Sequence, residues 1–181
     1  MSIAKKSVCA IAFMAIIMAL LGSTVSISLN YVNADTKASK SIDKVVKYAK
    51  KREGKSIRSF PSYFNNGRWC ADFVYYVSKK TKVANNKVYP KKRKSSVSSL
   101  MSWYKNKGRY HKNTKKFDPK KGDLVFLSTT SHVGIVAKET SSYVYLIHGN
   151  WSNKVKYTKL KKRGYTSSQR AEIKGYARPN Y

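Results

Sequence analysis

The sequence predicts an α+β fold in which helices come first and an antiparallel sheet follows. Apolar stripes with helical spacing occupy the part of the chain before residue 107. Short β-branched or aromatic runs between polar turns fill the part after residue 122. This order is typical of α+β domains, and we expect the helices to pack on a sheet of about five to six strands. The 181 residues suit one domain with a modest core.

Residue patterns place each element in order along the chain. Residues 35–40 have the composition of a polar linker, and residues 41–54 form an amphipathic helix that Ser41 caps and Gly54 ends. Residues 60–67 are irregular, with a turn at Asn66-Gly67. Two further helices are expected at 69–80 and 97–106, and strands are expected at 123–127, 132–138, 143–149, 153–159 and 173–177.

The first 34 residues have the pattern of a secretory signal peptide. Lys5 and Lys6 precede the apolar run Ser7–Gly22, which is short for a membrane span, and Val32–Ala34 provides a small-residue exit. We expect cleavage near Ala34 and no stable membrane span in the mature protein. The alternative is a retained N-terminal anchor.

The chain is strongly basic, with a formal net charge of +30 at pH 7. Loss of Lys5 and Lys6 with the signal leaves 36 of the 38 basic residues against 8 acidic ones, a net charge of +28. Such a charge attracts polyanions, although a lysine-rich surface that only aids solubility is the alternative. No RNA-recognition, zinc-finger or helix-turn-helix signature is present. In an exported protein, the expected partners are therefore anionic wall polymers and peptidoglycan rather than a specific nucleic acid, and we expect a monomer.

Cys70 is the candidate nucleophile. Removal of the signal takes away Cys9 and leaves Cys70 as the sole cysteine, so it has no internal disulfide partner. Cys70 is expected at the start of a helix, where unpaired N–H groups and the helix dipole favour a thiolate with a lowered pKa. Its own backbone N–H would point toward a developing oxyanion. The alternative is a small buried apolar side chain.

Two histidines lie on neighbouring predicted strands. If the connecting loop is centred on Thr140, His132 directly faces His148, and Asn150 lies on the same face of the sheet. A cysteine nucleophile needs a base and a third group that orients this base. His132 is therefore the candidate base, and His148 and Asn150 are equal candidates for the orienting group. Such a pair also predicts a rate that depends on a group titrating near neutrality.

Five segments in order carry a family resemblance. They are Trp69–Val74 around the nucleophile, Pro119–Phe126 before the histidine strand, Ser131–Val136 with the base, Ile147–Ser152 with the third residue, and Gly175–Pro179 in the closing strand. Together they resemble CHAP domains, the cysteine- and histidine-dependent amidohydrolases/peptidases. Two positions depart from the family: His148 often corresponds to an acidic residue, and Ser131 often corresponds to Asp.

The resemblance implies a papain-like fold that hydrolyses an amide bond of bacterial peptidoglycan without a cofactor or metal. The bond is either the N-acetylmuramoyl-L-alanine amide or one within the wall peptides. The candidate substrate contacts are Tyr63, Trp69 and Trp151. The chain then divides into a signal peptide at 1–34, a linker and helix at 35–59 and a CHAP-like catalytic domain at 60–181, and the mature protein is secreted and associated with the cell wall.

Three other functions remain open. A catalytically weak or inactive cationic module of the same fold would bind the wall without cutting it. Cys70, His132 and His148 are permissible zinc ligands, although no tight zinc motif is present. A secreted nucleic-acid binder would show strong, salt-sensitive affinity for DNA.

Overall fold

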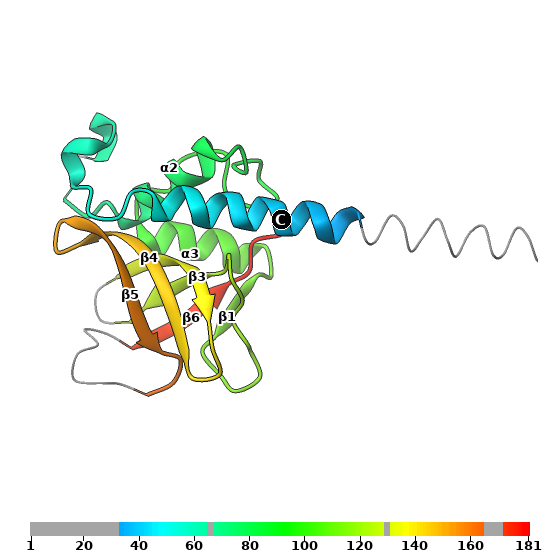
Figure 1. Cartoon of the computed structure of the whole chain (residues 1–181). Helices are drawn as coiled ribbons and strands as arrows, with labels where there is room; N and C mark the ends of the chain where they lie inside the picture. Colours follow the sequence, from blue (N-terminus) through cyan, green and yellow to red (C-terminus); the bar gives the residue numbers. More distant parts are fainter. Residues whose placement is uncertain (1–32, 65–66, 129–130, 165–171) are drawn as a thin grey trace, which may run out of the picture. The chain divides into compact units, whose positions relative to one another are not determined.

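The computed structural model describes residues 33–64, 67–128, 131–164 and 172–181 (Figure 1). The chain divides into two compact units, Met1–Ser39 and Lys40–Tyr181. The described residues of the first unit, 33–39, are helical. The expected apolar run of the signal, Ser7–Gly22, lies outside the described residues, and so does Asn66 of the expected turn. Within the described ranges, no helix combines the length and the apolar character that a membrane span requires.

The second unit confirms the predicted α+β fold. It begins with helical residues 40–50, followed by η1 (Ile57–Ser59), η2 (Ser62–Phe64), α2 (Cys70–Lys80), α3 (Val97–Asn106), β1 (Tyr110–Lys112), β2 (Leu124–Leu127), β3 (His132–Glu139), β4 (Tyr143–Trp151), β5 (Lys154–Lys161) and β6 (Ile173–Ala177). The strands form a six-stranded antiparallel sheet in the order β1-β6-β2-β3-β4-β5. Strand β1 was not predicted, because its three residues are too few for a periodic pattern.

The predicted linker at 35–40 is wrong. These residues are helical, so no helix begins at Ser41. The segment contains neither Gly nor Pro, and its Lys and Ala residues are good helix formers. The helical residues 40–50 are followed by a turn that ends at Gly54, whose φ of 80° glycine adopts without strain.

The β3–β4 hairpin has a different register from the predicted one. Val136 pairs with Leu146, one side-chain period away from the predicted partner, and the register shifts again between Val136 and Lys138. Next to the loop, Glu139 pairs with Val144, so the loop is centred between residues 141 and 142 rather than on Thr140. The extra residue in β3 then reduces the displacement from three residues to two near the site. The prediction that His132 directly faces His148 is therefore wrong. Because the displacement near the site is one full period, the two histidines still share a face.

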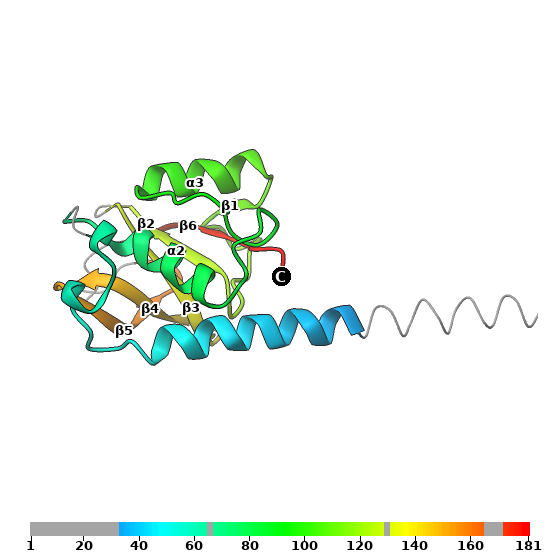
Figure 2. The ribbon, with the colours of Figure 1, turned by 90° about the horizontal axis from the view of Figure 1, so that it is seen from above.

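Apolar side chains cover both faces of the sheet. Helix α2 packs against β3 and β4, and α3 lies beside α2 and β1 (Figure 2). The core on this face includes Phe73, Val74 and Val77 of α2 with Val133, Ile135 and Ile147 of the sheet. A second core on alternate strand positions includes Val125, Val136, Val144, Leu146 and Tyr176.

Asp123 links two distant parts of the chain through its carboxylate. Its carboxylate is buried, accepts a hydrogen bond from the backbone N–H of Lys120 at 2.8 Å, and accepts two from the guanidinium of Arg178 at 3.1 and 2.9 Å. These contacts join the turn before β2 to the residue that follows β6. Asp123 therefore stabilises the sheet on which β3 and β4 are positioned.

Gly149 allows α2 to approach β4 closely. A Cβ atom at this position would lie 2.5 Å from Cζ3 of Trp69 and 2.6 Å from Cβ of Phe73. Real Cβ atoms essentially never come so close to other heavy atoms, so only glycine fits here without movement of α2. The contact spans both sides of Cys70 in the sequence and thus holds the first turn of α2 against the sheet.

We expect Gly149→Ala to destabilise the protein by about 1–3 kcal/mol, because the added methyl group overpacks the α2–β4 contact. Urea denaturation followed by circular dichroism measures this loss. Lys156→Ala, at an exposed position of β5, is the control and should stay within about 0.5 kcal/mol of the wild type. A Gly149→Ala protein as stable as the control would show that α2 can shift away from β4.

Candidate active site

The thiol of Cys70 lies against the backbone at the start of β3. Cys70 is the first residue of α2 and is 3% exposed. Its S–H donates to the carbonyl oxygen of Ser131, with 4.0 Å between Sγ and this oxygen. The sulfur also accepts a hydrogen bond from the backbone N–H of Val133. Ser131 and Val133 are the neighbours of His132 in the sequence. The fold therefore brings the sulfur to the strand position that carries His132.

The expected lowering of the pKa of Cys70 is wrong. Burial raises the pKa of this thiol above its ordinary value, and this effect exceeds the others. Hydrogen bonds from the backbone N–H groups of Val133, Ala71 and Cys70 itself act in the opposite direction, as expected for a helix start. The helix terminus is thus favourable for a thiolate, but the surrounding apolar core removes the water that an exposed thiolate would have.

His132 and His148 form a buried hydrogen-bonded pair. Nε2 of His132 lies 2.7 Å from Nδ1 of His148, and Oγ1 of Thr158 lies 2.9 Å from Nε2 of His148. His132 is 6% exposed and His148 is fully buried. Gly134 makes room for this pair, because a Cβ there would lie 3.0 Å from Cβ of His148. Both nitrogens of His148 are engaged, whereas Nδ1 of His132 lies outside this hydrogen-bonded chain.

Burial keeps both imidazoles neutral at neutral pH. It lowers the pKa of His132 to about 4. The pKa of His148 is well below the ordinary value, first because of burial and second because of the neighbouring His132. The indole of Trp151 packs on both rings, with centroid distances of 5.2 Å to His132 and 4.7 Å to His148. Trp151 therefore covers part of the pair.

Asn150 contacts the loop before α2. Its side-chain amide donates to the carbonyl oxygen of Gly67 at 3.0 Å, and its φ of 62° turns the end of β4 toward this loop. Among the hydrogen bonds of the described residues, the ring partner of His132 is His148. The structure thus gives the two candidates for the orienting position different contacts: His148 holds the imidazole and Asn150 holds the loop.

The three aromatic candidates occupy different places. Trp69 is 1% exposed and packs among core aromatic rings, so its position indicates packing rather than contact with a substrate. Tyr63 is half-buried on η2, where its ring contacts Tyr75 and the guanidinium of Arg93. Trp151 is half-buried and lies on the imidazole pair. Of the three, Trp151 is the one in contact with the pair.

Thr158 and the carbonyl group of Ser131 are parts of the site that the sequence analysis missed. Thr158 lies on β5, in a lysine-rich strand with no motif, and only the pairing of β5 with β4 brings it to His148. Among the described residues, the thiol of Cys70 bonds to Ser131 and the ring of His132 bonds to His148, so no hydrogen bond joins the thiol to the ring of His132. In the same part of the chain, no group of three or more His, Cys, Asp or Glu residues is arranged to hold a metal ion.

Comparisons with known proteins identify the family. The solved structure titled "The crystal structure of Ly7917" is similar to this chain with a TM-score of 0.49 and 14% sequence identity, over 77% of this chain and 62% of that chain. This chain thus spans less than two thirds of that protein. No curated protein matches the chain. The family model of the CHAP domain matches residues 62–150, which include Cys70, His132, His148 and Asn150. Residues 62–150 of this chain are a CHAP domain, a member of a family of peptidoglycan amidases and peptidases.

Proposed function

We propose that this protein is a secreted peptidoglycan hydrolase that cleaves an amide bond of the wall through a Cys-His nucleophilic mechanism. One observation supports this above the others. Cys70, the sole cysteine after residue 34, contacts the backbone on both sides of His132, and the ring of His132 is hydrogen-bonded to His148. A nucleophile, a base and an orienting group are the elements that such chemistry requires.

The hydrogen-bonded chain determines which nitrogen of His132 accepts the proton of the thiol. To accept at Nδ1, His132 must carry its own proton on Nε2, which then donates to Nδ1 of His148. His148 in turn carries its proton on Nε2 and donates to Oγ1 of Thr158. In this arrangement the hydroxyl of Thr158, which can donate or accept, accepts from Nε2 of His148, and Nδ1 of His148 accepts from Nε2 of His132.

The reaction starts from a neutral thiol and a neutral imidazole. When a substrate carbonyl reaches the sulfur, the thiol turns from the carbonyl of Ser131 and transfers its proton to Nδ1 of His132 while the C–S bond forms. The backbone N–H of Cys70, at the helix start, is placed to stabilise the oxyanion. The imidazolium then gives this proton to the leaving amine. Water attacks the resulting thioester, His132 takes one proton from it, and the sulfur leaves and regains that proton.

The surface charge supports attachment to the wall. A groove of about 750 Å³ is lined by Lys47, Lys50, Lys51 and Lys121 together with Asp43, Val46 and Ala137. These ammonium groups suit the anionic polymers of a bacterial wall. We propose that a signal peptide within residues 1–34 exports the chain, that the mature protein acts as a monomer at the wall, and that Trp151 and Tyr63 border the bound peptide.

A second candidate function is wall binding without catalysis. It is favoured by His148, because a neutral imidazole stabilises the imidazolium of His132 less than a carboxylate would. This module would keep the fold and the lysine-lined groove and would lack turnover.

Cys70→Ser separates the two functions. We expect the wild type to clear peptidoglycan in a zymogram and the variant to lose this activity by at least about 100-fold, because the alkoxide is far less accessible than the thiolate. Mass spectrometry of the released fragments identifies the bond that is cut. Wall binding should be the same in both proteins. Binding by both proteins without clearing by either would establish the inactive module instead.

Substitutions of the two orienting candidates should differ in effect. We expect His148→Ala to lower kcat by about 100-fold or more, since it removes the group that holds the base. Asn150→Ala should cause a smaller loss, because its amide contacts Gly67 rather than the imidazole. Steady-state kinetics on a soluble wall fragment measures both, with thermal unfolding as the control for folding. An equal or larger loss in Asn150→Ala would assign the orienting role to Asn150.

The pH profile should differ from the expected titration near neutrality. Because burial lowers the pKa of His132 to about 4, the imidazole stays neutral at mildly acidic pH. It becomes protonated only as the pH approaches 4. We expect kcat/KM to change little between about pH 6 and 8 and to fall as the pH drops below about 5. The measurement is kcat/KM against pH on the folded protein. An acid limb centred at the ordinary histidine value of 6.5 would mean that the pair is solvated during catalysis.

A further inference from the structure

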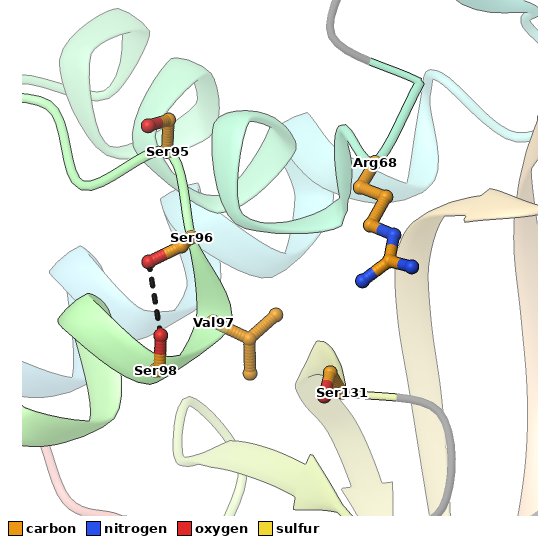
Figure 3. Close-up of a pocket in the computed structure, with 6 residues that line it drawn as sticks. All are labelled: Arg68, Ser95, Ser96, Val97, Ser98 and Ser131. Atoms are coloured by element: carbon orange, nitrogen blue, oxygen red, sulfur yellow. Dashed lines mark hydrogen bonds between the residues drawn. The ribbon is translucent and has the colours of Figure 1, made fainter.

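A cavity beside the thiol contains none of the proposed catalytic side chains. Its volume is about 310 Å³, and it is lined by Arg68, Ser95, Ser96, Val97, Ser98 and Ser131 (Figure 3). Figure 3 shows the guanidinium of Arg68, the side chain of Val97 and Ser131 around the same open space. Ser95 and Ser96 lie in the segment that leads into α3, and Ser98 lies in the first turn of α3.

The cavity adjoins the proposed reaction centre through two of its lining residues. Ser131 supplies the carbonyl oxygen that lies 4.0 Å from Sγ of Cys70. Arg68 comes just before Trp69 and Cys70 in the sequence. A peptide whose scissile amide reaches the sulfur would therefore place a neighbouring group at the mouth of this cavity.

The lining of the cavity suits an anion. It contains a guanidinium and several hydroxyl groups, and none of its lining residues is acidic. A guanidinium has five N–H donors, so Arg68 can bind an anion in addition to the contacts that it makes within the protein. Its planar geometry matches a carboxylate, which it binds with two parallel hydrogen bonds. The hydroxyl of Ser96 caps α3 by accepting from the backbone N–H of Ser99 at 3.1 Å, and it also bonds to the hydroxyl of Ser98 at 3.1 Å. The hydroxyls of Ser95 and Ser131 can rotate to donate to the carboxylate oxygens.

The volume favours a small carboxylate over a polymer. A space of 310 Å³ equals roughly ten water molecules at about 30 Å³ each, which is enough for one amino-acid side chain with its carboxylate. A wall polymer with repeating phosphates needs an open groove, such as the lysine-lined one beside residues 47–51.

We propose that this cavity is a carboxylate-binding subsite in which Arg68 and the hydroxyls of Ser95 and Ser131 bind a free carboxylate of the wall peptide next to the scissile amide. The subsite rests on the proposed function and would determine which substrates the enzyme prefers. The enzyme selects peptides with a free carboxylate over peptides in which this group is amidated. Arg68 is then a specificity-determining residue.

The test uses pairs of soluble wall peptides that differ only in a carboxylate or a carboxamide near the cleaved bond. We expect the full-length wild type to cleave the carboxylate peptide with a kcat/KM about 10- to 100-fold higher, the range of a charge-assisted hydrogen bond. Arg68→Gln should abolish this preference, because it lowers kcat/KM for the carboxylate peptide far more than for the carboxamide peptide. Arg68→Lys should give an intermediate rate. Arg58→Gln, which removes the same charge from an exposed position on η1, is the matched control and should retain full selectivity.

Several outcomes would overturn the subsite. Equal wild-type rates on both peptides would do so, and so would an Arg68→Gln protein that slows both peptides alike, since this is the result of a structural role. Competition by inorganic phosphate that depends on Arg68, without selectivity between the peptides, would assign the cavity to phosphate. If the wild type cleaves neither peptide, the proposed function fails. Equilibrium binding of the two peptides to wild type and Arg68→Gln then tests the subsite by itself.

Discussion

The close packing of α2 on β4 at Gly149 determines where the thiol of Cys70 lies. The rings of Trp69 and Phe73 rest on the backbone of β4 at a distance that no side chain at residue 149 would permit. Because these two residues stand on either side of Cys70, the first turn of α2 cannot move without opening the core. The same contact sets the sulfur against the start of β3 and so beside His132. The geometry of the site is thus a consequence of core packing.

The buried imidazole pair gives the site an electrostatic character of its own. A carboxylate partner would raise the pKa of His132, whereas burial lowers it here. Burial and then the neighbouring His132 lower the pKa of His148. Burial also raises the pKa of the thiol. The thiol therefore keeps its proton in the resting protein, and in the proposed mechanism the ion pair forms only as the substrate is attacked. Such a site relies on the positions of its groups rather than on a stored thiolate.

Charge acts at two ranges in this protein. The net charge of the whole chain is spread over many lysines, and its field is screened beyond about 8 Å at physiological ionic strength, so it favours contact with a polyanionic wall without selecting a bond. The guanidinium of Arg68 acts at hydrogen-bond distance within a small cavity beside the thiol. At that range the directions of its donors can distinguish a carboxylate from an amide. The proposed attachment to the wall and the proposed selection of a carboxylate thus depend on different residues.

Local pattern predicted most of the helices and strands and selected the candidate residues Cys70, His132 and His148. Helical spacing placed Cys70 at the start of a helix, and β-branched runs located β2 to β6, since both signals depend on neighbours in the sequence. Only the tertiary structure decided how these residues meet. The position of the β3–β4 loop moved His132 from a direct pair with His148 to a diagonal one, and the irregularity in β3 kept both on one face. The pairing of β5 with β4 brought Thr158 to the site. The core also reversed the expected pKa of the thiol, because desolvation depends on atoms that are distant in the sequence.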